Sequence, residues 1–205
     1  FERYLKNRGY YNAEVKDSIS RKGQKLDLFY LIKTNEPYIV DSVGYEFADT
    51  SISRLVLSDT ASGFLKKNDI FDVETFQKER NRITRKMKEE GYYFFRKDFI
   101  SFVADSTLLG NRVKVVCKID KFLRRTESGK VIREDHRVCR IKDIYLYPAF
   151  DPKRAIAEQQ MYFKTFDTIP YEDYEVIFSE KLRIKPDVIL KANTIEEGER
   201  FDIRK

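Results

Sequence analysis

Hydrophobic and polar positions over residues 38–121 predict five elements in the order strand, helix, helix, strand, strand. The first is rich in Tyr, Ile and Val, the next two carry apolar residues at helical spacing, and the last two alternate apolar and polar positions. Asp72 is suited to cap the second helix, and Gly91 to end it in a left-handed conformation. The five predicted ranges are 38–47, 51–67, 73–90, 97–105 and 111–121.

The same periodicities assign faces to these elements. Lys114 and Lys118 fall on the polar side of the last predicted strand, and Phe99, Ser101 and Val103 share the second face of the strand before it. Three apolar sets each share one face of their element: Val73, Phe76, Ile83 and Met87 on the helix, Ile100, Phe102 and Ala104 on one strand, and Val113, Val115, Cys117 and Ile119 on the other.

Three short segments recur later in the chain, in the same order. One pair has a helical pattern that ends in Gly followed by two Tyr, at Gly9 and at Gly91. We interpret both glycines as helix ends and the paired tyrosines as packing between helix and sheet. The recurring pairs are 4–11 with 86–93, 38–43 with 139–144, and 70–73 with 200–203. Because the three offsets differ, insertions separate the copies of one repeated unit.

The N-terminal segment supplies only the last three elements of such a unit. A helix ends at Gly9, and strands are predicted over 13–20 and 25–34. Residues 35–37 form a short linker, which implies a restricted angle between the first unit and the second. An incomplete unit would expose an apolar face. Since the chain also begins without Met, we expect it to be a piece of a longer polypeptide.

The C-terminal segment supplies only the first elements. A strand is predicted over 138–148 and a helix near Pro186, with an insertion at about 150–184 in which 167–170 is a turn between two short strands. The charged stretch 122–137 is expected to be a looser link. The predicted organisation is the C-terminal part of one unit at 1–36, a complete unit at 37–122, and the N-terminal part of a further unit, with the insertion, at 138–205.

This arrangement resembles tandem POTRA domains of the BamA/TamA family of outer-membrane assembly proteins. The resemblance rests on residues 4–15, the 35–40 junction, and 67–72 followed by Gly91 and two tyrosines. The stretch from 182 to 201 looks like the Bacteroidetes-type forms of the family, and the insertion departs from the common pattern. The resemblance implies an α+β fold of β-α-α-β-β modules, with two helices on a three-stranded mixed sheet.

The resemblance also implies a function without cofactors or catalysis. POTRA domains are periplasmic parts of outer-membrane proteins, and they pass unfolded polypeptides or partner proteins to a β-barrel that would follow in the same chain. In the family's sheet order the second strand is at the edge, where it can pair with an extended peptide. The partner-binding residues are then Asp98, Phe99, Ile100, Ser101, Phe102, Val103 and Ala104, with Val15, Asp17 and Ile19 in the first unit.

Two simpler interpretations stay open beside partner binding at the strand edges. The edges can be simply solvated or covered by a neighbouring module, and the chain can be a passive spacer or adaptor between an outer-membrane barrel and an inner-membrane partner.

Composition excludes several other classes. Hydrophobic residues make up 41% of the 205, including 16 Phe and 13 Tyr, so disorder is not expected. No apolar run approaches the roughly 18 residues of a membrane-spanning helix. The sequence contains neither of the phosphate-binding glycine motifs G-x-x-x-x-G-K and G-x-G-x-x-G. The single His, His136, lies in a charged run that is typical of a solvated loop. An enzyme or a Cys/His zinc site is therefore not expected.

The charge is mildly basic, at +6, and part of it lies on the second predicted helix. A solvated helix face is the first interpretation, an anionic lipid or acidic partner the second, and nucleic acid the least favoured because no aromatic residues are interleaved. Arg80, beside the apolar stripe, is expected to extend its charge toward the surface. Cys117 is expected to be a buried thiol, and pairing with Cys139 stays open. The basic residues are Lys78, Arg80, Arg82, Arg85, Lys86 and Lys88.

Overall fold

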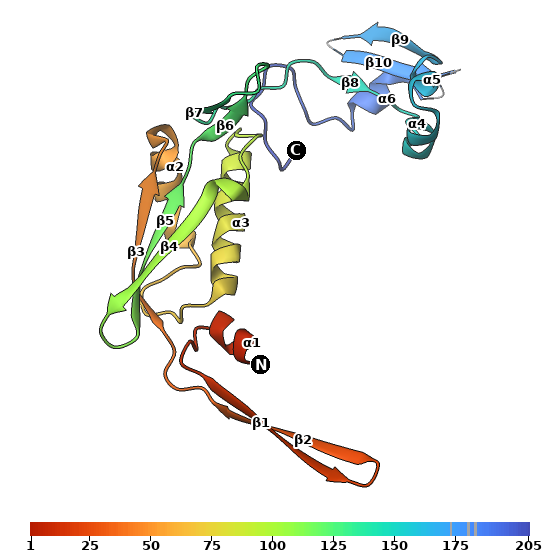
Figure 1. Cartoon of the computed structure of the whole chain (residues 1–205). Coiled ribbons are helices and arrows are strands. Elements are labelled where there is room, and N and C mark those ends of the chain that lie inside the picture. Colours follow the sequence, from red (N-terminus) through yellow and green to blue (C-terminus); the bar gives the residue numbers. More distant parts are fainter. Residues whose placement is uncertain (173, 180, 183) are drawn as a thin grey trace. The chain divides into compact units, whose positions relative to one another are not determined.

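The computed structural model describes the whole chain except residues 173, 180 and 183. The described residues form two compact units, one of 1–88 with 94–137 and one of 89–93 with 138–205. Figure 1 labels the helices and strands of both units.

The first unit contains a complete β-α-α-β-β module, as predicted. Its sheet has the strand order β3-β5-β4, with β3 parallel and β4 antiparallel to the central β5 (Figure 1). Phe76 from the long helix packs with Val40, Leu65, Val113 and Val115 in the core. The class is therefore α+β. The elements of the module are β3 (Ile39–Phe47), α2 (Ser53–Ser58), α3 (Val73–Glu89), β4 (Ile100–Leu108) and β5 (Arg112–Ile119).

Two predicted boundaries in this module are wrong. The first helix covers only α2 within 51–67, because the Ser58 and Thr60 hydroxyls bond to the Leu55 and Leu57 carbonyl oxygens and the chain passes into a 3-10 turn (Thr60–Ser62). The strand expected over 97–105 begins later, since Lys97–Phe99 form another 3-10 turn.

A buried carboxylate, absent from the apolar face predicted for the long helix, fixes the connection between the two helices. Glu79 lies on the apolar face of α3 and is fully buried. Its two oxygens accept hydrogen bonds from the Phe64 backbone N–H (2.9 Å) and from Arg82 Nη2 (2.6 Å), and Arg82 also pairs with Asp59. Because the charge is both paired and hydrogen-bonded, the desolvation cost of burying it is offset.

Residues 122–134 form a hairpin of β6 (Phe122–Arg125) and β7 (Val131–Glu134), where a charged link was expected. The expectation of a solvated His136 is also wrong, because its exposed fraction is only 8%. Its backbone N–H donates to Asp49 Oδ2 (2.7 Å), and its ring lies 4.8 Å from that of Phe95. These contacts fasten the end of the hairpin segment to the complete module.

The N-terminal part consists of α1 (Glu2–Asn7) and an antiparallel hairpin of β1 (Glu14–Lys22) and β2 (Lys25–Lys33). As expected for an incomplete unit, the hairpin exposes many apolar side chains. Those more than one third exposed are Ile19, Leu26, Leu28, Phe29, Tyr30, Leu31 and Ile32.

The second unit contains a small sheet of order β8-β10-β9, in which β8 is parallel and β9 antiparallel to β10. Order and directions match those of β3-β5-β4. The strand expected over 138–148 is reduced to β8. The turn expected at 167–170 is wrong, since it lies within β9, where Pro170 is tolerated at an edge. The elements are β8 (Tyr145–Leu146), α4 (Pro152–Glu158), α5 (Gln160–Phe163), β9 (Phe166–Tyr171), β10 (Tyr174–Ser179) and α6 (Pro186–Leu190).

Two joints in the chain share one hydrogen-bond pattern. At the first joint the Gly9 carbonyl accepts from the Tyr38 N–H (2.8 Å), and the Tyr38 carbonyl accepts from the Phe71 N–H (2.8 Å). At the second, Gly91 accepts from Cys139 (2.8 Å), and Cys139 accepts from Phe201 (3.0 Å). The interpretation of the two glycines as helix ends is confirmed, since both have φ of 92°.

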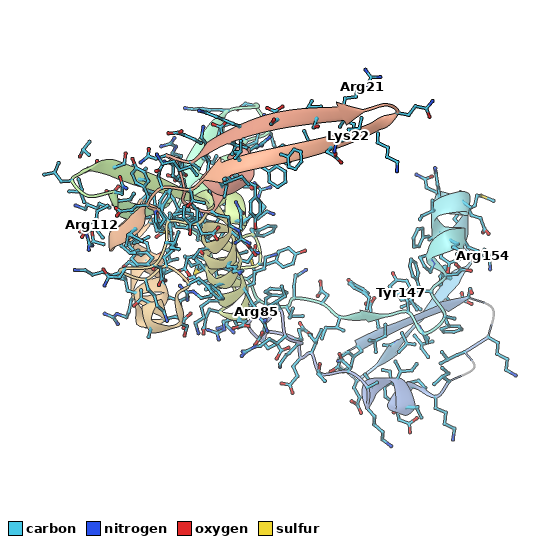
Figure 2. The ribbon with its side chains drawn as sticks, turned by 90° about the horizontal axis from the view of Figure 1, so that it is seen from below. Arg21, Lys22, Arg85, Arg112, Tyr147 and Arg154 are labelled. Atoms are coloured by element: carbon cyan, nitrogen blue, oxygen red, sulfur yellow. The ribbon has the colours of Figure 1, made fainter. Side chains whose placement is uncertain are left out.

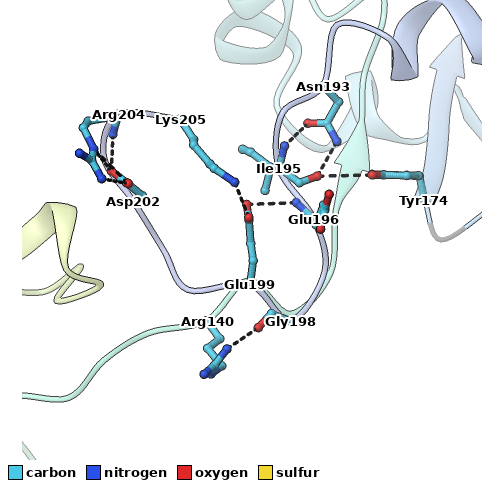
Figure 3. Close-up of polar contacts among 10 residues, drawn as sticks. All are labelled: Arg140, Tyr174, Asn193, Ile195, Glu196, Gly198, Glu199, Asp202, Arg204 and Lys205. Carbon is cyan, nitrogen blue, oxygen red and sulfur yellow. Dashed lines mark hydrogen bonds and ion pairs between the residues drawn. The ribbon is translucent and has the colours of Figure 1, made fainter.

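The two joints also share a side-chain hydrogen bond. Asp72 Oδ1 accepts from the Glu74 N–H (2.8 Å), and Asp202 Oδ1 accepts from the Arg204 N–H (2.9 Å) (Figure 3). Arg204 also pairs with Asp202 through its side chain, which lowers the pKa of Asp202 to about 2. The first member of each recurring sequence pair thus contributes to the first joint, and the second member contributes to the second joint.

Candidate functional site: an open strand edge

β4 is the outer strand of the complete module. It pairs with β5 on one side, and within the described part of the chain no strand pairs with its other side (Figure 1). Successive residues of an antiparallel strand direct their backbone groups alternately toward and away from the partner. The direction of each group on β4 can therefore be assigned from a few hydrogen bonds.

The Asp120 N–H donates to the Phe99 carbonyl (2.9 Å), and Phe99 therefore faces β5. Counting along β4, the backbone groups of Ile100, Phe102 and Ala104 point away from β5. An independent bond agrees, because the Ile119 carbonyl of β5 accepts from the Ala48 N–H beyond β3 (2.9 Å). The open edge is thus made by residues whose side chains face the helices.

Arg80 of α3 closes one end of this edge. Its Nε donates to the Ile100 carbonyl oxygen (3.0 Å), and its Cζ lies 5.3 Å from the centre of the Phe102 ring. The guanidinium thus lies over the strand edge rather than simply extending to solvent. The backbone groups of Phe102 and Ala104, farther along the strand, are left available for pairing.

The other residues predicted for this edge take different places. Asp98 and Phe99 precede β4 in a 3-10 turn, and the Phe99 ring packs 5.0 Å from His136. Ser101 and Val103 direct their backbone groups toward β5, opposite Lys118 and Val116. They contribute side chains on the face that the helices do not cover.

The second predicted edge lies on β1. Val15, Asp17 and Ile19 pair in register with Ile32, Tyr30 and Leu28, and therefore share one face of the hairpin. Ile19 is 59% exposed. The hairpin ends in a basic tip, with Arg21 and Lys22 projecting from it (Figure 2). This edge belongs to a two-stranded sheet.

The chemistry that the site offers is backbone hydrogen bonding. Among the described residues, no group of three or more His, Cys, Asp and Glu side chains is placed to hold a metal ion. The described helices include none with the length and apolar character needed to cross a membrane. Burial raises the pKa of the Cys117 thiol to about 12, so it is protonated at neutral pH and not a nucleophile.

Sequence reasoning missed Glu79, the position of Arg80 and the burial of His136. Glu79 had a weak signal, because Phe76 and Ile83 place it on the apolar face by helical spacing. The contacts of the other two depend on residues distant in sequence.

No family model matches the chain, and no curated protein does. Among solved structures, it is similar to a crystal structure of POTRA domains 3–5 of BamA from Haemophilus influenzae, with 15% sequence identity and a TM-score of 0.43. The similarity covers 88% of this chain and 76% of that one.

The strand orders and directions described above define the class of this protein. It is an α+β protein that contains two three-stranded mixed sheets, each with the strand order first, third, second.

Proposed function

We propose that the chain is a non-enzymatic scaffold that receives extended polypeptide segments by pairing them with β4. The observation that carries the proposal is the outward direction of the Phe102 and Ala104 backbone groups, beside which the described residues place no strand. Backbone pairing depends little on the sequence of the added strand, so this edge suits a receptor for many clients.

The resemblance to the BamA/TamA family, in its Bacteroidetes-type form, suggests the setting. The proposed location is the periplasm, within an outer-membrane protein that assembles or translocates other proteins. The proposed clients are unfolded outer-membrane polypeptides or periplasmic partner subunits.

β4 is favoured over β1 as the receiving edge. The sheet that contains β4 is packed against α3 through Phe76, so its edge is held in place before a client binds. β1 belongs to a two-stranded hairpin, which is marginally stable by itself. Val15, Asp17 and Ile19 are proposed as a secondary edge.

We also propose the organisation of the modules. Residues 1–36 belong to one module and 37–122 form the second. In 138–205, the insertion at 150–184 supplies the helices and two strands that complete a small sheet with β8.

An Ala104→Pro variant tests the proposal. Proline removes an outward N–H without removing a β4–β5 hydrogen bond, and proline is tolerated on edge strands. The measurement is an NMR titration of the isotope-labelled chain with an extended peptide. Shifts along residues 100–108 are expected for the original chain and are expected to be lost in the variant.

An Ala104→Ser variant is the matched control, since it keeps the N–H at nearly the same size. It is expected to bind as the original chain does. Equal peptide binding by a folded Ala104→Pro variant would refute pairing at β4.

The passive spacer is the second candidate function. The repeated joints favour it, because Gly9 and Gly91 connect their helix ends to the next segment through the same backbone hydrogen bonds. In the same NMR titration a spacer predicts no shifts along β4.

A further inference from the structure

An aromatic cavity lies beside the open edge of β4, in the first unit. Its volume is about 290 Å³. For comparison, an apolar cavity of about 150 Å³ binds benzene. Its lining comes from the first joint, from the edge strand and from the central strand, and consists of Tyr11, Tyr38, Phe71, Ala104, Ser106 and Val113. The cavity thus has room for one large apolar side chain.

The cavity is continuous with a row of aromatic rings that runs along the helix side of the sheet. The Phe71 ring lies 5.9 Å from Tyr11 at one end and 5.0 Å from Phe76 at the other. Phe76 lies 4.9 Å from Phe102. The pairing of β4 with β5 also becomes irregular after Asp105, next to the cavity. The row therefore connects the cavity with the other end of the edge.

Arg80 stands at that other end, above Phe102. Its Nε is bonded to the Ile100 carbonyl, and within the described part of the chain its Nη1 and Nη2 have no hydrogen-bond or ion-pair partner. A half-buried guanidinium with two unused nitrogens favours a carboxylate, which it can bind through paired hydrogen bonds. The two ends of the edge thus differ in chemistry.

We propose that this edge selects its strands by side chain, and that it binds an extended segment with a large apolar, preferably aromatic, residue in the cavity and a carboxylate at Arg80. This inference rests on the proposed function, because it needs a strand added to β4. Ala104 lies four positions after Ile100, roughly 13 Å along the strand. Because alternate residues share a face, the acidic and the apolar residue are four positions apart.

The experiment measures the affinity of labelled nonapeptides for the full chain by fluorescence anisotropy. The host peptide alternates Thr and Ser. It carries Phe at its third and Glu at its seventh position, and a second peptide has these two exchanged, because either strand direction is possible. Replacement of Glu by Gln, or of Phe by Ala, in the better peptide is expected to weaken binding by about tenfold each.

Two protein variants assign these losses to the two ends. Arg80→Gln is expected to abolish the preference for Glu over Gln and to keep that for Phe over Ala. Ala104→Leu, which fills the cavity, is expected to abolish the preference for Phe and to keep that for Glu. Val103→Leu, on the other face of the same strand, is the control and is expected to keep both preferences.

The outcomes separate this inference from the proposed function. If all peptides bind equally and Ala104→Pro removes their binding, β4 receives strands without selection and the inference is wrong, while the proposed function stands. If no peptide binds, both are wrong. If N-acetylphenylalanine amide alone binds as tightly as the peptide, the cavity is a small-molecule site and the inference is again wrong.

Discussion

Replacement of Gly9 by Ala tests the account of the first joint. Gly9 has φ of 92°, in the left-handed region, and an added Cβ would lie 2.6 Å from Ile70 Cγ2 and 3.0 Å from the Phe71 carbonyl oxygen. Two costs therefore combine at this position, the strained backbone and the close contact. The Ile70 methyl group can move away, but the Phe71 backbone is held in place by its hydrogen bond to Tyr38.

The two costs can be estimated separately. A left-handed conformation costs a non-glycine residue about 1–2 kcal/mol. Overpacking by one methyl group adds about 1–3 kcal/mol. The sum predicts that Gly9→Ala lowers the free energy of unfolding of the first unit by roughly 2–5 kcal/mol. Gly110 supplies the control, since its φ is 75° but an added Cβ would have nothing within 4 Å.

The assay is urea unfolding followed by far-ultraviolet circular dichroism, because the chain has no Trp. Hydrogen exchange of the Tyr38 amide, which donates to Gly9, reports on the joint itself. Gly110→Ala is expected to show the backbone cost alone. The reasoning is refuted if the two variants lose equal stability within about 0.5 kcal/mol and the Tyr38 amide stays equally protected.

Three further predictions concern buried polar groups of the first unit. Glu79→Ala should lower the free energy of unfolding by about 3–5 kcal/mol in urea, because it leaves Arg82 with an unpaired part of its charge inside the protein; a loss below about 1 kcal/mol would contradict the buried-pair account. Burial opposes ionisation of Asp49, but hydrogen bonds from the Ser51 side chain and the His136 backbone outweigh it and lower the pKa of Asp49. Its contribution to stability is therefore present above the unfolded pKa near 4 and is lost as pH falls below it, so the stability difference between the original chain and Asp49→Asn should shrink below about pH 4. Burial raises the pKa of Cys117 to about 12. Labelling of this thiol by a thiol reagent at neutral pH, followed by mass spectrometry, should therefore be slow until urea unfolds the module. Fast labelling of Cys117 in the folded chain would contradict its burial.

The repeated joint explains why the recurring segments have three different offsets. Gly91, Cys139 and Phe201 correspond to Gly9, Tyr38 and Phe71, although the spacing along the chain differs in each case. The hydrogen bonds join a helix end, the start of a strand and the turn before a helix. Loops between these points can change in length without altering the joint, so sequence similarity survives only at the contact points.

Errors of the sequence interpretation fall where distant residues decide the structure. His136 reads as solvated from its charged neighbours, but its ring packs against Phe95 and Phe99 from the other side of the module. Pro170 reads as part of a turn, yet β9 lies at a sheet edge where proline is allowed. Local patterns contain no information about such partners.

The sequence by itself determined the order of elements and the buried faces of the complete module, because the periodicity of apolar residues records which side of each strand and helix meets the core. It also contained the three recurring segment pairs, which the structure brings together in the two joints. The tertiary structure alone decided which backbone groups of β4 are open, that Arg80 covers one end of them, and that Tyr11 reaches a cavity at the other. These features depend on the strand pairing and on side chains far apart in the sequence, and periodicity specifies neither.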